Sequence, residues 1–177
     1  LGTAMNFIRC TYESHAHKIL DILNEAIVHS TALYDYSPRK IETMVNWFQQ
    51  KDIGGFPVIG VIGDADELMG FATYGSFRAW PAYKYSVEHS VYIHADYRGK
   101  GFGQLLMQQL ITSARSQQYH TMIAGIDILN EASVGLHEKL GFTHAGTIRQ
   151  AGYKFDRWLD LSFYQLLLET PKKPVDG

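Results

Sequence analysis

A six-residue segment, Arg98-Gly99-Lys100-Gly101-Phe102-Gly103, combines three glycines with two cationic side chains. Glycines allow the backbone to approach a ligand closely and to turn its N–H groups toward it. Apolar residues at helical spacing predict a helix from about Gly101 to Gln117, and the N-terminus of a helix carries partial positive charge. We therefore expect the loop to hold an anion such as a phosphate, with Arg98 and Lys100 as auxiliary cations.

Other phosphate-binding patterns fit this loop less well. The ATP-type pattern G-x-x-x-x-G-K-[ST] does not occur in the sequence. The dinucleotide pattern G-x-G-x-x-G would follow a strand directly, whereas five residues separate Gly99 from Ile93, the expected end of the preceding strand. Asp127, near the end of the next predicted strand, keeps the dinucleotide interpretation open, and a glycine-rich turn without a ligand is a further alternative. The pattern [RQ]-x-x-G-x-G matches in full, with Arg98, Gly101 and Gly103 in its fixed places.

This loop resembles the pyrophosphate loop of the GNAT superfamily, the acetyl-coenzyme A-dependent N-acetyltransferases. A second segment, NEASVGLHEKLGF from Asn130 to Phe142, is similar to the superfamily's N-x-x-[AS]-x-x-[LF]-Y-x-K-x-G-F helix, in the family's order and spacing. The stretches Tyr85–Gly103 and Gly152–Leu166 resemble the phosphinothricin and methionine sulfone/sulfoximine acetyltransferases, and that resemblance extends from Phe7 to Leu168.

The resemblance implies how acetyl-CoA binds. The glycine loop, extended by Gln104, would hold the pyrophosphate, and the backbone of the strand ending at Ile93 would pair with the pantetheine arm and supply an N–H for the oxyanion. Asn130 and Ser133 would contact the coenzyme from the following helix. The expected cofactor-binding residues are Val91, Tyr92, Ile93, Arg98, Gly99, Lys100, Gly101, Phe102, Gly103, Gln104, Asn130 and Ser133.

Glu88 is the candidate general base. Its predicted strand places Glu88, Ser90 and Tyr92 on one face and the apolar positions on the other. A carboxylate in the middle of a strand is costly to bury unless it is satisfied or functional, and partial desolvation would raise its pKa toward neutrality. An ordinary solvent-exposed glutamate is the alternative. A base at this position would remove the proton of an amine before it attacks a thioester, directly or through a water.

His137 is the candidate acid for the leaving thiolate. It shares one helix face with Asn130 and Ser133 and stands where much of the superfamily has tyrosine, as in the phosphinothricin subgroup; a helix-surface histidine is the alternative. The guanidinium of Arg78 suits a substrate carboxylate, and Tyr83 is a candidate to line the amine pocket. Many relatives have a second arginine where this chain has Trp80, which favours a sulfone, a sulfoximine or an apolar amino acid over phosphinothricin.

The elements that must position these residues follow from periodicity and turn residues. A strand–helix–strand unit around the glycine loop requires a parallel pair, and the flanking hairpins require antiparallel pairs. The chain is therefore predicted to be mixed α/β, a GNAT fold with a central twisted sheet of about seven strands flanked by about four helices. The predicted strands are 6–11, 56–62, 68–76, 85–93, 122–128, 142–148 and 158–168, and the predicted helices are 15–30, 37–51, 101–117 and 130–141.

Composition limits the possible partners. The 177 residues carry a formal net charge of -2, so no bulk positive field favours nucleic acid or anionic lipid. No apolar run approaches the ~20 residues of a membrane span, and the histidines form no set with metal-ligand spacing, so we expect no membrane, no nucleic acid and no metal. One domain is predicted from 5 to 170, preceded by a cloning remnant at 1–4 and followed by a loose tail at 171–177. The resemblance implies a cytoplasmic homodimer.

The expected function is transfer of the acetyl group of acetyl-CoA to the α-amine of a small amino acid-like substrate by direct attack on the thioester. The substrate would be of the methionine sulfone/sulfoximine or phosphinothricin type. A protein or peptide N-acetyltransferase and a non-catalytic acetyl-CoA sensor are the alternatives. A sensor would need neither Glu88 nor His137.

Overall fold

The computed structural model describes residues 4–177, so most of the segment predicted to be a cloning remnant lies outside the described residues. The chain forms two compact units. The first comprises residues up to Tyr74 together with Ser90–Leu110, and the second comprises Gly75–His89 and Ile111–Gly177. The strand order β1-β2-β3-β4-β5-β7-β6, with four α-helices, confirms the predicted mixed α/β fold. The prediction of one domain from 5 to 170 stays a prediction.

The first unit is built from β1 (Asn6–Arg9), α1 (Tyr12–His29), α2 (Glu42–Gly54), β2 (Val58–Ile62), most of β3 (Leu68–Ser76) and the start of α3 (Phe102–Ser116). Both β1 and β3 pair with β2 in antiparallel register. Helix α1 begins earlier than predicted because Thr11 caps it, its side chain accepting from the Ser14 N–H. Helix α2 begins at Glu42, later than Ser37 predicted.

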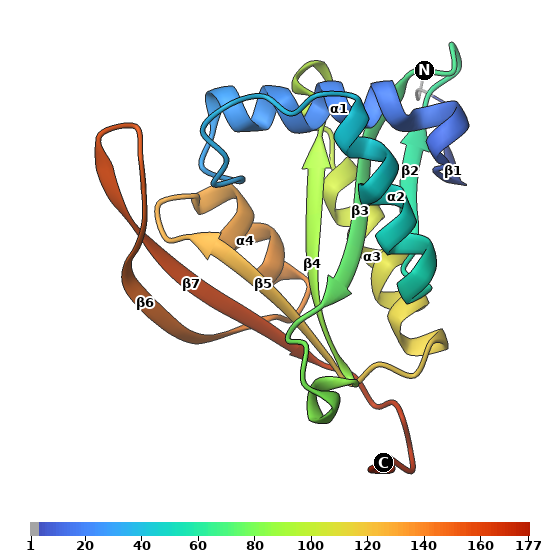
Figure 1. The fold of residues 1–177 in the computed structure, drawn as a ribbon, viewed down its shortest axis with the longest axis vertical. Coiled ribbons are helices and arrows are strands. Elements are labelled where there is room, and N and C mark those ends of the chain that lie inside the picture. The colour runs from blue at the N-terminus through green and yellow to red at the C-terminus, as the bar shows by residue number, and fades with distance from the viewer. Residues whose placement is uncertain (1–3) are drawn as a thin grey trace. The chain divides into compact units, whose positions relative to one another are not determined.

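The core of the first unit lies between its two N-terminal helices and its strands (Figure 1). The apolar face of α1 packs into this core, because Ile19, Leu23 and Ile27 are all buried. Helix α2 contributes Met44 and Phe48, and the strands contribute Phe71 among others. The single cysteine, Cys10, belongs to this core, and burial raises the pKa of its thiol to about 12.

The second unit contains the first half of β4 (Ser86–Ile93), β5 (Thr121–Asp127), α4 (Glu131–Lys139), β6 (Thr143–Lys154) and β7 (Arg157–Leu167). Strand β4 pairs with β5 in parallel, as the strand–helix–strand pattern predicted. Strands β5, β7 and β6 lie side by side in that order, with antiparallel pairing (Figure 1). The sequence predicted that β6 ends at Ile148, but the hairpin continues through a register shift to Lys154.

Local signals fix both ends of α4. The Asn130 side chain accepts a hydrogen bond from the Ser133 N–H at 3.2 Å, which makes it the N-cap. Gly141 follows the helix with φ +92°, a left-handed conformation that favours glycine. Both ends of α4 are thereby fixed, and the helix and its N-cap carry three predicted site residues, Asn130, Ser133 and His137.

An ion pair between a buried carboxylate and a partly exposed arginine joins β5 to the β6–β7 hairpin. The Asp127 side chain is 2 % exposed, and its Oδ2 lies 2.5 Å from Nη2 of Arg157. The second carboxylate oxygen accepts from the Leu129 N–H at 3.2 Å. Beyond this hairpin, Val175 in the tail donates its N–H to the hydroxyl of Tyr85 at 3.0 Å. None of the described helices is long and apolar enough to cross a membrane.

Candidate functional site

The glycine loop has the backbone of an anion-binding loop. Gly99 has φ +76° and Gly101 has φ +84°, and nothing lies within 4 Å of a Cβ built at either position. Glycine is therefore required at both positions by the left-handed backbone conformation, since a side chain would meet no neighbouring atom. Helix α3 begins directly afterwards at Phe102, so the loop and the first turn together present backbone N–H groups at a helix N-terminus. Within this unit Lys100 is exposed, with its ammonium 5.3 Å from the centre of the Tyr97 ring.

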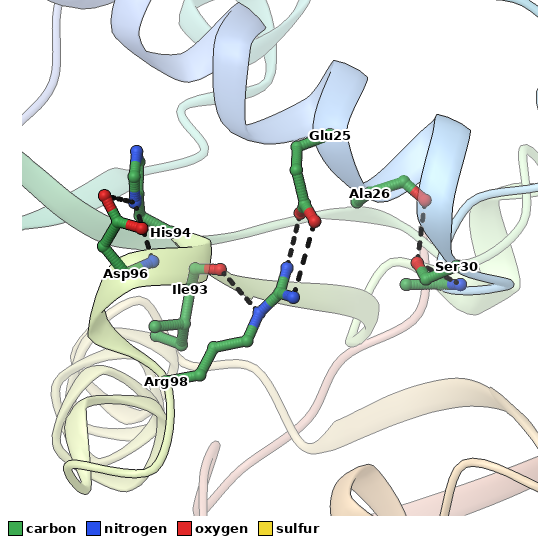
Figure 2. Close-up of polar contacts among 8 residues, drawn as sticks. Glu25, Ala26, Ser30, Ile93, His94, Asp96 and Arg98 are labelled. Carbon is green, nitrogen blue, oxygen red and sulfur yellow. Dashed lines mark hydrogen bonds and ion pairs between the residues drawn. The ribbon is translucent and has the colours of Figure 1, made fainter.

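Arg98 has a partner that the sequence did not predict. Its Nη2 lies 2.5 Å from Oε2 of Glu25 on α1, and its Nη1 lies 3.5 Å from the other carboxylate oxygen. Its Nε donates to the carbonyl of Ile93 at 3.2 Å (Figure 2). The guanidinium is thus engaged by protein groups on two sides. Glu25 and Arg98 are 73 residues apart, so no local pattern could have paired them.

The strand residues expected to meet the pantetheine arm are half-buried. Val91, Tyr92 and Ile93 form the last part of β4, and the Tyr92 ring packs 5.4 Å from the Phe71 ring. Gln104 is half-buried on α3 in the same unit. The carbonyl of Ile93 already accepts from Arg98. The predicted contacts of these residues with coenzyme stay predictions.

Glu88 lies in the second unit, where β4 pairs with β5. It stands opposite Ile123, the last of three paired positions in the parallel ladder. Although the Glu88 side chain reaches solvent, desolvation by the surrounding protein raises the pKa of its carboxyl, and the positive charge of Arg78 opposes this shift. A carboxylate with a raised pKa is suited to accept a proton near neutral pH.

Arg78 and Tyr83 gather around one aromatic ring near Glu88. The Arg78 guanidinium lies 5.5 Å from the centre of the Phe77 ring, and Tyr83 meets the same ring edge-on at 5.9 Å. Both side chains are exposed, as is Trp80. The predicted substrate residues therefore share a neighbourhood in the second unit.

A cavity of about 240 Å³ opens beside these residues. Glu88, Ile123 and Gln165 stand directly opposite one another across three neighbouring strands, so their side chains share one face of the sheet. Ile123 and Gln165 line the cavity, which places Glu88 on the face where the cavity lies. The volume is below the usual range for drug-sized ligands and fits a small molecule. The lining residues are Phe77, Ile123, Ala145, Gly146, Phe163 and Gln165.

His137 is buried and paired with a second histidine, so it is not the helix-surface histidine that was the alternative to an acid. It is 2 % exposed, and its Nε2 lies 2.9 Å from Nε2 of His89, which is 5 % exposed. The Nδ1 of His137 lies 2.7 Å from the carbonyl oxygen of Ser133, so Nδ1 must carry the hydrogen. The Nε2 of a neutral His137 then accepts from the Nε2–H of His89. The Phe142 ring packs edge-on against His137 at 5.0 Å.

This pairing determines the charge of both rings. Nδ1 of His89 is a buried atom without a hydrogen-bond partner among the described residues. Burial, reinforced by repulsion from His137, lowers the pKa of His89 to about 3. Burial also lowers the pKa of His137, and its bond to the Ser133 carbonyl opposes the shift. The role of His137 as an acid stays a prediction, and this arrangement argues against it, because its one N–H is already donated to a carbonyl.

Sequence reasoning missed two residues of these clusters, His89 and Glu25. His89 could be placed on the inner face of its strand by alternation, but nothing in the sequence indicated its partner 48 residues away. Within the described residues, no three His, Cys, Asp or Glu side chains gather as a potential metal site.

Comparison with known proteins identifies the family of this chain. The model of the acetyltransferase (GNAT) family matches residues 18–142. The L-methionine sulfoximine/L-methionine sulfone acetyltransferase of Pseudomonas paraeruginosa is 43% identical over 154 residues, which are 87% of this chain and 90% of the relative. A solved structure of a candidate acetyltransferase from Acinetobacter baylyi ADP1 superposes with TM-score 0.98 at 56% identity, covering 99% of this chain and 98% of the other.

A third relative was solved with its coenzyme. The phosphinothricin acetyltransferase of Sinorhizobium meliloti in complex with AcCoA gives TM-score 0.91 at 29% identity, covering 98% of this chain and 94% of the other. The family model spans more than half of the present sequence, and the family resemblance predicted from the glycine loop and the Asn130–Phe142 helix is confirmed. The chain belongs to the acetyltransferase (GNAT) family.

Proposed function

We propose that this protein transfers the acetyl group of acetyl-CoA to the α-amine of a small amino acid-like substrate of the methionine sulfone/sulfoximine or phosphinothricin type. The observation that carries the proposal is Glu88, a carboxylate with a raised pKa on the same sheet face as a small cavity. The similarity to an L-methionine sulfoximine/L-methionine sulfone acetyltransferase supports the substrate class.

The coenzyme would bind through backbone groups. The open backbone at Gly99 and Gly101 fits a pyrophosphate, and the N-terminus of α3 adds partial positive charge. The end of β4 would pair with the pantetheine arm, and Asn130 and Ser133 would contact the coenzyme from α4. The bound thioester supplies an activated acetyl group, and a backbone N–H of β4 would stabilise the oxyanion.

Glu88 would act as the general base. A substrate amine is protonated near neutral pH and must lose a proton before it can attack. Partial desolvation raises the pKa of Glu88 and makes it a stronger proton acceptor than an ordinary glutamate. We assign His137 to holding α4 against β4, because both of its ring nitrogens are already hydrogen-bonded.

Arg78 and the cavity would select the substrate. The Arg78 guanidinium is exposed and suits the α-carboxylate of an amino acid. Mostly apolar groups line the cavity, which fits an apolar or weakly polar side chain. Tyr83 lies at the same aromatic ring as Arg78 and would contact the substrate. Because Trp80 replaces a second arginine of many relatives, we expect a sulfone or sulfoximine to be preferred over phosphinothricin.

The protein would act as a cytoplasmic homodimer without nucleic-acid or membrane partners. The family resemblance supports the location and the dimer. Exposed aromatic side chains on the β6–β7 hairpin, Phe155 and Trp158, offer apolar surface for a subunit contact.

Thiol release from acetyl-CoA with a panel of amines tests the proposal. The panel holds L-methionine sulfone, L-methionine sulfoximine, phosphinothricin, L-leucine and a lysine peptide. We expect the sulfone and sulfoximine to be the best substrates. Turnover with the peptide alone would keep the family and replace the substrate class, and coenzyme binding without any turnover would favour a sensor.

A cavity-filling variant tests the location of the amine site. Ala145→Phe should raise KM for the amine by about tenfold or more and leave KM for acetyl-CoA unchanged, because Ala145 lines the cavity. Ala151→Phe, an exposed position on the same strand outside the lining, is the matched control. Equal effects of the two variants would move the amine site elsewhere.

A further inference from the structure

The glycine loop is preceded by a braced segment. Between Ile93 and Arg98 the chain forms a short 3-10 turn, Ala95–Tyr97, in which Nδ1 of His94 accepts from the Asp96 N–H at 3.1 Å. The His94 N–H donates to the carbonyl of Met69 on β3 at 2.9 Å. The Arg98 Nε bond to the Ile93 carbonyl closes the segment from its other end (Figure 2). The backbone that leads into Gly99 is therefore fixed by several contacts within the first unit.

Glu25 completes this brace from α1. Its carboxylate faces the Nη1 and Nη2 edge of Arg98, while the Ile93 carbonyl occupies the Nε side. A guanidinium offers two edges on which parallel N–H groups can bind a carboxylate or phosphate. Both edges of Arg98 are thus in use. A phosphate could not bind Arg98 in bidentate fashion without displacing Glu25 or Ile93.

The charges favour the same interpretation. Glu25 cancels the charge of Arg98 at a separation of 2.5 Å, so the pair adds little attraction for a pyrophosphate. Lys100, which makes no ion pair with a described carboxylate, is the cation left in the loop, together with the partial charge of the α3 N-terminus. Glu25 and Arg98 therefore contribute by positioning the backbone of the loop.

We propose that Glu25 is a positioning residue for coenzyme binding, which holds Arg98 as a strut between α1 and the end of β4. In this role Arg98 fixes the start of the loop, and the loop N–H groups and Lys100 bind the pyrophosphate. The inference rests on the proposed function, since it assumes that acetyl-CoA binds at this loop. The alternative is that Glu25 releases Arg98, which then binds the incoming phosphate. Removing the charge of Glu25 should weaken CoA binding if Glu25 positions Arg98, and should strengthen it if Glu25 competes with the phosphate.

Binding of CoA measured by titration calorimetry at several salt concentrations separates the two roles. We expect Glu25→Gln and Arg98→Met each to weaken CoA binding by about tenfold, and the double variant to be no weaker than either, because both break one strut. Lys100→Ala should flatten the dependence of log Kd on log salt, whereas the double variant, which removes one charge of each sign, should leave that slope unchanged. Glu13→Gln removes an equal charge from an exposed site on α1 and should leave affinity at the wild-type value.

Steady-state kinetics adds a readout that general destabilisation would not give. Glu25→Gln should raise KM for acetyl-CoA and leave kcat and the KM for the amine unchanged. Glu25→Asp, which keeps the carboxylate, should restore part of the affinity. Tighter binding by Glu25→Gln, or a loss of salt dependence in the double variant equal to that of Lys100→Ala, would overturn the strut. Failure of the wild-type protein to bind CoA would overturn the proposed function as well, whereas normal binding by all variants would overturn only the inference.

Discussion

The buried histidine pair should make the protein lose stability on mild acidification. Both rings are neutral in the fold, and the pKa of His89 is lowered from its ordinary value of 6.5 to about 3. A depressed pKa means that the stabilising contribution is complete above pH 6.5 and declines as pH falls, because only the unfolded chain then takes up the proton. The decline continues until the pH reaches the folded-state pKa of about 3.

The magnitude follows from linkage. One proton taken up only by the unfolded state costs about 1.4 kcal/mol per pH unit below its unfolded pKa. His89 alone should therefore lower the free energy of unfolding by about 2 kcal/mol between about pH 7 and about pH 5. The pKa of His137 is lowered too, so its contribution has the same sign.

Replacing one ring isolates this contribution. In His89→Gln the amide N–H can still donate to Nε2 of His137, but the residue does not titrate. Urea unfolding at about pH 7 should show that the variant is less stable than the wild type, because packing against Phe142 is lost. Between about pH 7 and about pH 5, its free energy of unfolding should fall by about 2 kcal/mol less than that of the wild type. His17→Gln, an exposed histidine on α1, should keep the wild-type pH dependence. Equal pH dependence in the wild type and His89→Gln would refute a neutral buried His89.

Glu88→Gln should lower kcat by about 10²- to 10⁴-fold, the usual contribution of a general base, while Glu138→Gln, exposed on α4, should not; equal kcat in the two variants would remove Glu88 from the mechanism. In the wild type, kcat/KM should fall as pH drops through the raised Glu88 pKa, because a protonated carboxyl cannot accept the proton, and a flat acid limb would contradict this role. Arg157→Ala should destabilise the fold by about 1–3 kcal/mol in urea unfolding, since the buried Asp127 carboxylate loses its ion-pair partner and keeps the Leu129 N–H. An unchanged midpoint would show that water replaces the guanidinium. Gly101→Ala should weaken CoA binding at a cost of about 1–2 kcal/mol, because alanine resists its φ of +84°, whereas Gly135→Ala on α4 meets no atom within 4 Å and should bind normally.

Local patterns predicted most of the fold. Strand β3 has the predicted bounds, Leu68 to Ser76, because alternation and flanking turns mark both ends. Gly141 could be recognised as a helix stop because left-handed backbone favours glycine. The end of β6 could not be predicted, because its residues beyond Ile148 are mostly exposed and carry no inward-facing apolar alternation. The late start of α2 was missed because Ser37-Pro38 resembles a helix start but remains outside the helix.

Sequence patterns identified positions of the candidate site where the backbone conformation requires one residue type. Gly99 and Gly101 could be identified because their conformation excludes other residues. The partners of Arg98 and His137 could not, since a side-chain pair across 73 or 48 residues depends on how the elements pack. For Arg98 we therefore propose a strut instead of the expected phosphate ligand, and for His137 an anchor instead of the expected acid.

Strand β4 brings the proposed base and the buried histidine pair next to each other. Its two-residue period turns Glu88 toward the cavity face and His89 toward the core, so adjacent residues serve chemistry and packing. Through the Nε2 contact of 2.9 Å, His89 holds His137, and His137 in turn holds the carbonyl of Ser133 on α4. The proposed base and the helix proposed to contact coenzyme are therefore tied to the same strand. A one-residue slip of β4 would expose His89 and bury Glu88 together, so the register of this strand determines both.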